Sequence, residues 1–151
     1  MKTNETAKRL YIAYGSNLNL AQMACRCPDA RVVDKSELRG FRLAFRGEGR
    51  GGVATVEPCE GCTVPVLVWE LSSDDEASLD RYEGWPYLYR KEDFTVELQG
   101  APVTAMAYVM NEGKPLSSPD EFYFDTIEEG YITADFDTAA LRRAAEEPEQ
   151  A

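Results

Sequence analysis

The segment over residues 79–90, LDRYEGWPYLYR, carries residue types suited to general acid/base chemistry. Glu83 falls at the end of a predicted helix, where the helix dipole disfavours a negative charge, and aromatic residues follow it. Aromatic neighbours that exclude water raise the pKa of a glutamate from about 4.3 toward neutrality, where the carboxyl can both take and return a proton. The alternative is a solvated glutamate, and pairing with Arg81 or Arg90 would lower its pKa again.

A second motif, Tyr14-Gly15-Ser16-Asn17-Leu18, predicts a strand that turns through glycine into a helix. Such a turn leaves backbone N–H groups unpaired, and these groups can hold an anion such as a carboxylate. Gly15 would let the ligand approach the backbone closely. The alternative is a simple capped turn, in which the side chain of Ser16 or Asn17 satisfies the same amides.

The chain contains no histidine. This absence excludes Ser-His-Asp and Cys-His nucleophile systems, histidine-ligated metal centres and any histidine acid or base. If the protein is an enzyme, its proton carrier must be a carboxylate, a tyrosine, a lysine or a cysteine.

Four cysteines form two short pairs, Cys25-x-Cys27 and Cys59-x-x-Cys62. Four thiolates can bind zinc without histidine, and the second pair has acceptable spacing for half of such a site. The first pair is too closely spaced, and Cys27 before Pro28 is typical of a buried thiol at a helix end. We therefore predict no metal, and we favour a disulfide even less because the expected compartment is reducing.

Four arginines form a basic run between residues 39 and 50: Arg39, Arg42, Arg46 and Arg50. Arg42 and Arg46 share one face of a predicted strand, which favours a solvated surface that offsets the acidic end of the chain. The alternative is a clamp for a substrate carboxylate.

Length and composition predict one globular domain over residues 1–151, with a polar, frayed tail from about residue 147. The net charge of −11 would repel a phosphate backbone, so nucleic acid is excluded as a partner. The longest apolar stretch is far shorter than the ~20 residues of a membrane span, which argues against a membrane partner. The N-terminal segment lacks the apolar core of a signal peptide, so we expect a cytoplasmic protein.

The pattern of elements indicates an α+β fold: a mixed, antiparallel-rich sheet curled into a small barrel with flanking helices. Residues 122–131 follow a helical stripe, which is most simply a buried face, although Tyr123 can still direct its hydroxyl to a cavity. The expected strands cover residues 9–14, 30–38, 41–46, 53–57, 63–71, 91–98 and 103–110. The expected helices cover residues 18–27, 72–82, 120–135 and 137–147.

Three separated segments resemble the γ-glutamylcyclotransferase-like family. They are Tyr14–Leu18, the run Leu79-Asp80-x-x-Glu83-Gly84 followed by Tyr89-Arg90-Lys91, and Pro119 with Tyr123-x-x-x-Ile127-x-x-Gly130. The resemblance covers residues 11–131, and Asp120 departs from the serine that the family often carries after the proline. It implies the mixed barrel expected above.

The resemblance also implies an activity: conversion of a γ-glutamyl amino acid or γ-glutamylamine to 5-oxoproline and a free amine, with no cofactor. The substrate's own α-amine would attack its γ-carbonyl, and Glu83 would act as the general acid/base. The implied substrate-binding residues are Tyr14, Gly15, Ser16, Asn17, Leu18, Tyr89 and Tyr123.

Two alternative functions remain open at this point. One is a non-catalytic module of the same fold that binds a small carboxylate or a protein, and the other is an interaction domain stabilised by zinc. The sequence leaves the leaving group and the oligomeric state undetermined.

Overall fold

The computed structural model describes residues 8–150, and its side chains are described as far as residue 146. One five-stranded sheet has the order β2-β3-β1-β5-β4. Its strands are β1 (Arg9–Ala13), β2 (Arg31–Arg46), β3 (Val53–Leu71), β4 (Tyr89–Leu98) and β5 (Ala101–Met110). β1 pairs in parallel with β5, and the other neighbours pair antiparallel, so the predicted mixed, antiparallel-rich sheet is confirmed.

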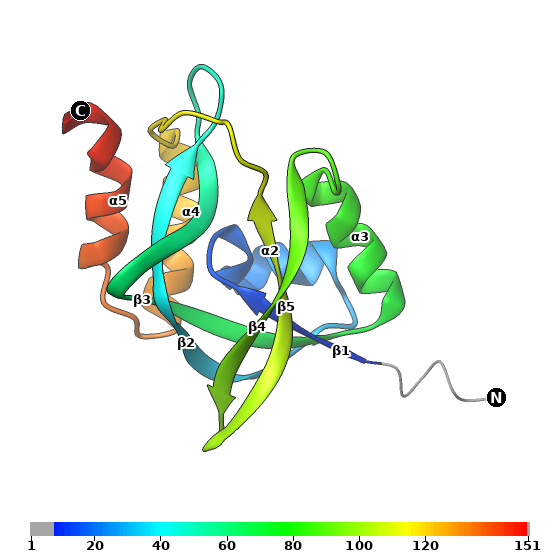
Figure 1. Cartoon of the computed structure of the whole chain (residues 1–151). Coiled ribbons are helices and arrows are strands. Elements are labelled where there is room, and N and C mark those ends of the chain that lie inside the picture. The colour runs from blue at the N-terminus through cyan, green and yellow to red at the C-terminus, as the bar shows by residue number, and fades with distance from the viewer. Residues whose placement is uncertain (1–7, 151) are drawn as a thin grey trace.

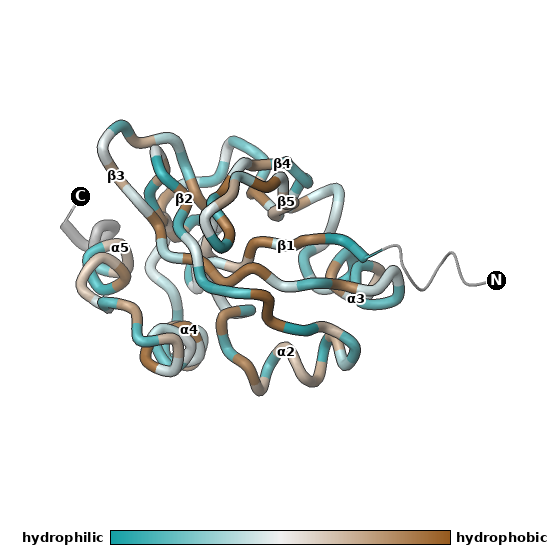
Figure 2. Tube along the Cα trace, turned by 90° about the horizontal axis from the view of Figure 1, so that it is seen from below, coloured by the Kyte–Doolittle hydropathy of each residue, from teal (hydrophilic) through white to brown (hydrophobic). Residues whose placement is uncertain are grey.

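The helices gather around this sheet (Figures 1 and 2). They are the short 3₁₀ helix η1 (Ser16–Leu18), α2 (Leu20–Arg26), α3 (Ser73–Glu83), α4 (Glu121–Thr133) and α5 (Ala139–Gln150). α4 and α5 lie beside β2 and β3, whereas α2 and α3 lie nearer β1. The helical backbone of α5 continues to Gln150, beyond its expected end, and the side chains of the expected tail lie outside the described residues. None of the described helices is long and apolar enough to cross a membrane.

The sheet curls strongly, but it is not a closed barrel. Its two edge strands approach each other through side chains: the Ser36 hydroxyl donates to the carbonyl of Glu97 at 2.5 Å, and the rings of Phe41 and Phe94 pack edge to face at 5.2 Å. No backbone ladder joins β2 to β4 within residues 8–150. The expected small barrel is therefore corrected to an open, curled sheet with an α+β architecture.

β2 and β3 each replace two predicted strands. The ladder pairs Arg39 with Thr63 and Phe41 with Pro58, so residues 59–62 leave the ladder opposite Gly40. Gly40 has a φ of +85°, which only glycine adopts readily. Residues 58–62, which separate two of the predicted strands, thus contain a local excursion within one strand, because the partner strand β2 pairs with both halves in one continuous direction.

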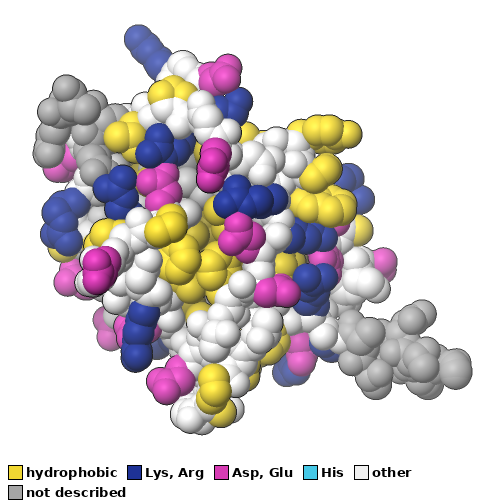
Figure 3. Space-filling model, in the orientation of Figure 1, with side chains coloured by type: hydrophobic (Ala, Val, Ile, Leu, Met, Phe, Trp, Pro, Cys, Tyr) yellow, Lys and Arg dark blue, Asp and Glu magenta, His cyan; other side chains and the backbone are white. Residues whose placement is uncertain are grey.

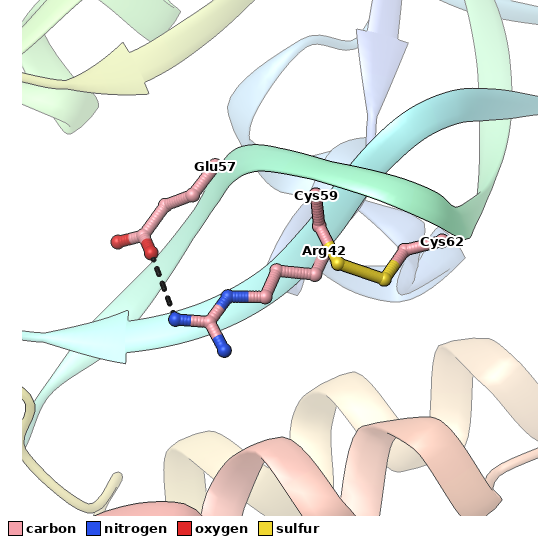
Figure 4. Close-up of a disulfide and its surroundings, with 4 residues drawn as sticks. All are labelled: Arg42, Glu57, Cys59 and Cys62. Carbon is pink, nitrogen blue, oxygen red and sulfur yellow. Dashed lines mark hydrogen bonds and ion pairs between the residues drawn. A yellow bond between two sulfur atoms is a disulfide. The ribbon is translucent and has the colours of Figure 1, made fainter.

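The excursion is closed by a disulfide between Cys59 and Cys62 (Figure 4). This pairing corrects the expectation that a disulfide was the least favoured state of these cysteines. It also removes two of the four thiolates that a zinc site with only cysteine ligands would need. Cys27 is buried as expected, and Cys25 is exposed. Burial raises the pKa of the Cys27 thiol to about 12, which makes it unreactive at neutral pH.

The basic run lies on a charged surface. Arg42 donates to Glu57 at 3.3 Å (Figure 4). Arg46 pairs with the same carboxylate. On the face in Figure 3, basic and acidic side chains intermix around a central apolar hollow. These ion pairs support the interpretation of the run as a surface feature.

Helix α3 begins and ends where its sequence predicts. The Ser72 hydroxyl accepts the N–H of Asp75 at 3.1 Å, and the Asp75 carboxylate accepts the N–H of Ser72 at 3.2 Å, which forms a capping box. At the other end Gly84 adopts the left-handed conformation, with φ 68° and ψ 37°. Because the helix is fixed at both ends, its last residue, Glu83, has a defined position.

Candidate active site

A cavity of about 230 Å³ lies where β1, α3, β4, β5 and α4 meet. It brings together residues that lie far apart in the sequence, including Glu83 and the turn at Gly15. The sequence-predicted residues that line it are Tyr14, Gly15, Ser16, Asn17, Glu83, Tyr89 and Tyr123. Leu18 does not line it, since its side chain is fully buried behind the turn.

Glu83 is the one carboxyl group among the residues that line the cavity. It is half-buried, and no group in the described part of the chain donates a hydrogen bond to its carboxylate. Burial raises the pKa of Glu83 to about 7, and the positive charge of Arg26 acts in the opposite direction. At neutral pH this carboxyl therefore exists in both protonation states in comparable amounts.

The aromatic groups that surround Glu83 are only partly those expected. Trp85 and Tyr87 follow it in the sequence, but they are 41% and 89% exposed, respectively. Tyr89 does line the cavity, together with tyrosines from β1, β5 and α4. The pKa shift thus has the predicted direction, whereas most of the tyrosines that line the cavity come from distant segments.

The turn after β1 lines the cavity through residues 15–17. η1 starts at Ser16, and no side chain caps it, which excludes the capped-turn alternative. The amides of Ser16 and Asn17 have no protein acceptor within the described residues. The side chains are occupied elsewhere: Ser16 Oγ lies 3.1 Å from the Tyr82 hydroxyl, and Asn17 Nδ2 donates to the Tyr11 hydroxyl at 2.9 Å. The turn is therefore free to bind an anion through its backbone.

Two glycines allow the turn to pack this closely. A Cβ added to Gly15 would lie 3.1 Å from the Cβ of Ala54. A Cβ added to Gly130 of α4 would lie 2.7 Å from the carbonyl carbon of Leu18, closer than real side chains approach. Gly130, which lies in the third family-like segment, thus supports the turn from behind.

Tyrosine hydroxyls fix other parts of the cavity wall. Tyr14 donates to the carbonyl of Tyr108 at 2.5 Å, and Tyr89 donates to the carbonyl of Ala54 at 2.6 Å. Tyr123 accepts the N–H of Ala54 at 3.0 Å, so its own proton remains available to another acceptor. Burial raises the pKa of Tyr14, Tyr89 and Tyr123 above its usual value. These groups are neutral hydroxyls at pH 7.

Sequence reasoning missed three of the cavity tyrosines: Tyr11, Tyr82 and Tyr108. Tyr82 is adjacent to Glu83 and lies within the segment 79–90, so the sequence could have indicated it. Tyr11 and Tyr108 are brought together by the pairing of β1 with β5, which no local pattern indicates. The arginine clamp for a carboxylate is not part of this cavity, because none of the four arginines of the run lines it.

The chain matches the family model described as gamma-glutamyl cyclotransferase, AIG2-like, over residues 11–130. A gamma-glutamylcyclotransferase from Bos taurus is 31% identical over 119 residues, which cover 73% of this chain and 63% of the relative. One from Homo sapiens is 33% identical over 110 residues, which cover 67% of this chain and 58% of the relative. The chain therefore spans about three fifths of the length of these curated relatives.

A solved structure of a gamma-glutamyl cyclotransferase has the same fold, with a TM-score of 0.76 and 28% sequence identity. The match covers 85% of this chain and 80% of that structure.

We predict that Gly130→Ala destabilises the protein by about 1–3 kcal/mol, because the added methyl group collides with the backbone of Leu18. In an unconstrained helix the same change stabilises by roughly 0.5–1 kcal/mol, so the sign of the effect is diagnostic. Urea unfolding measures it. Glu129→Ala, at the exposed neighbouring position, is the control and should change stability by less than about 0.5 kcal/mol. A more stable Gly130→Ala protein would show that the contact is not close.

We also predict a pH-dependent difference in stability between the wild type and Glu83→Gln. The folded protein holds the Glu83 proton more tightly than the unfolded chain, so wild-type stability falls as the pH rises from about 4.5 to about 7. Over this window the free energy of unfolding of Glu83→Gln, measured relative to that of the wild type, should rise by up to about 3 kcal/mol. Glu112→Gln, at an exposed carboxyl, should show no such trend. A constant difference for Glu83→Gln would mean that its carboxyl is solvated.

Proposed function

Since the chain belongs to the gamma-glutamyl cyclotransferase, AIG2-like family, we propose that it converts a γ-glutamyl compound to 5-oxoproline and a free amine or amino acid. The observation that carries this proposal is the position of Glu83, whose pKa is about 7, in the same cavity as the uncapped turn at Ser16. The first group can move protons at neutral pH, and the second can bind a carboxylate.

The proposed reaction needs no nucleophile from the protein. The substrate's α-nitrogen forms a bond to its own γ-carbonyl carbon, and the bond from that carbon to the leaving nitrogen breaks. Glu83 takes one proton from the α-ammonium group before the attack and gives it to the leaving nitrogen as the C–N bond breaks. It then takes a second proton from the ring nitrogen, which becomes the N–H of 5-oxoproline, and passes this proton to the released amine. Holding the amine and the carbonyl in a reactive geometry lowers the barrier by up to roughly 7–11 kcal/mol in the best intramolecular cases. The absence of histidine is compatible with every step.

The remaining groups would bind and orient the substrate. We assign the backbone amides of Ser16 and Asn17 to its α-carboxylate or to the oxyanion that forms on the γ-carbonyl. The free hydroxyl proton of Tyr123 is a further donor for either oxygen. Gly15 would allow the ligand to approach the turn, and Leu18 and Gly130 would hold that turn in place.

The size of the cavity favours recognition of the γ-glutamyl group alone. Cavities that enclose drug-sized ligands measure roughly 300–1,000 Å³, whereas this one measures about 230 Å³. The leaving group would therefore extend through the opening. Both γ-glutamyl amino acids and γ-glutamylamines fit this description.

A panel of γ-glutamyl substrates, with 5-oxoproline release as the readout, tests the proposal. We expect the wild type to release 5-oxoproline and folded Glu83→Gln to lose at least about 10²-fold in rate. Glu112→Gln, which is remote from the cavity, should match the wild type. Unchanged turnover in Glu83→Gln would remove Glu83 from the mechanism. Tight binding of a γ-glutamyl compound without turnover would favour the alternative of a non-catalytic binding module.

A further inference from the structure

Arg26 connects three parts of the site without lining the cavity itself. One guanidinium nitrogen donates to Oδ1 of Asn17 in η1 at 2.6 Å, and the other donates to Oε1 of Gln22 in its own helix, α2, at 2.7 Å. The guanidinium carbon lies 3.7 Å from the ring centroid of Tyr82, which precedes Glu83 in α3. One side chain thus links the amide-bearing turn to the end of the helix that carries the acid/base.

The contact with Asn17 also extends into the cavity wall. The amide oxygen of Asn17 accepts from Arg26, and its amide nitrogen donates to the hydroxyl of Tyr11. These two partners determine the orientation of the Asn17 side chain. The charge on Arg26 polarises this amide, so its effect reaches the cavity through one intervening residue.

The cavity lining itself carries no positive charge. Its residues are tyrosines, small or apolar residues, Ser16, Asn17 and the acidic Glu83, without a lysine or an arginine. The proposed substrate and its product, 5-oxoproline, both bring a carboxylate into this space. Placing two negative charges together in a partly dehydrated cavity is unfavourable unless a cation lies near them.

We propose that Arg26 is a positioning residue that holds the turn at Asn17 against Tyr82 and supplies the positive charge for ligands that bear an α-carboxylate. This inference rests on the function proposed above. It predicts that Arg26 discriminates a charged ligand from a neutral one of the same shape.

The groups that face Glu83 from the surrounding elements leave Arg26 as its electrostatic partner. The tyrosines from β1, β4, β5 and α4 are neutral at pH 7, because burial raises the pKa of each. Tyr82 of α3 packs its ring against Arg26 itself. Behind Tyr108, Lys91 is already paired with Asp80 at 2.9 Å and with Glu76 at 2.7 Å. Arg26 lowers the pKa of Glu83, so its removal should move the ionisation of Glu83 to higher pH.

The test compares Arg26→Gln with Arg26→Lys. The glutamine variant loses the charge but keeps a donor for Asn17, and the lysine variant keeps the charge. Titration calorimetry with 5-oxoproline and with its neutral carboxamide reports binding without turnover. We expect Arg26→Gln to lose roughly tenfold in affinity for 5-oxoproline and much less for the carboxamide, and we expect Arg26→Lys to recover most of the loss. The acidic limb of the kcat/KM profile should move to higher pH in Arg26→Gln alone.

Arg81→Met is the matched control, because Arg81 is closer to Glu83 in sequence but is exposed and bonded to Ser78. It should leave both readouts unchanged. If Arg26→Gln fails to fold, Arg26→Met is the second uncharged variant, with the same expected result. Two results would overturn the role of Arg26 and leave the proposed function intact. One is an equal loss of affinity for 5-oxoproline and for its carboxamide in Arg26→Gln, and the other is an unchanged kcat/KM profile in Arg26→Gln while the wild type is active. A wild type that neither binds nor forms 5-oxoproline would instead overturn the proposed function.

Discussion

The site depends on placing the carboxyl group of Glu83 in a half-buried position where no group in the described part of the chain donates a hydrogen bond to it. Such a group destabilises the folded state when ionised, so the surrounding structure must hold it in place. Helix α3 does this through its two ends: the capping box at Ser72 fixes the start, and the left-handed Gly84 ends the helix directly after Glu83. Tyrosines line the rest of the cavity around Glu83. The hydroxyls of Tyr14 and Tyr89 also donate to backbone carbonyls of β5 and β3.

The turn at Ser16, to which we assign anion binding, is the second constraint, and the packing of two glycines allows its conformation. Gly15 lets the turn lie against β3, and Gly130 lets α4 approach the backbone of Leu18. The third motif of the sequence is thus connected to the first by direct contact, although more than 100 residues separate them. Arg26 and Asn17 add a polar connection from the turn to α3. The turn and the end of α3 that carries Glu83 are therefore linked by direct side-chain contacts.

Local signals predicted much of this arrangement, because caps and stops act through neighbouring residues. Ser72, Gly84 and Pro28 mark helix ends that the structure confirms to within a residue or two. The features that depend on distant pairing were not predictable. The pairing with β3 makes β2 one strand through Gly40. The disulfide between Cys59 and Cys62 was missed for another reason, because the expected reducing compartment disfavoured it. At Glu83 the expected aromatic neighbours Trp85 and Tyr87 are exposed, and tyrosines from other elements replace them.

The most direct test of this account is the ionisation of Glu83 in the free protein. Carboxyl ¹³C NMR of glutamate-labelled protein, with Glu83→Gln used to assign the resonance, follows this group without substrate. The account predicts a titration midpoint near pH 7 for Glu83. A midpoint at the usual glutamate value of about 4.3 would show a solvated carboxylate and would contradict the central claim.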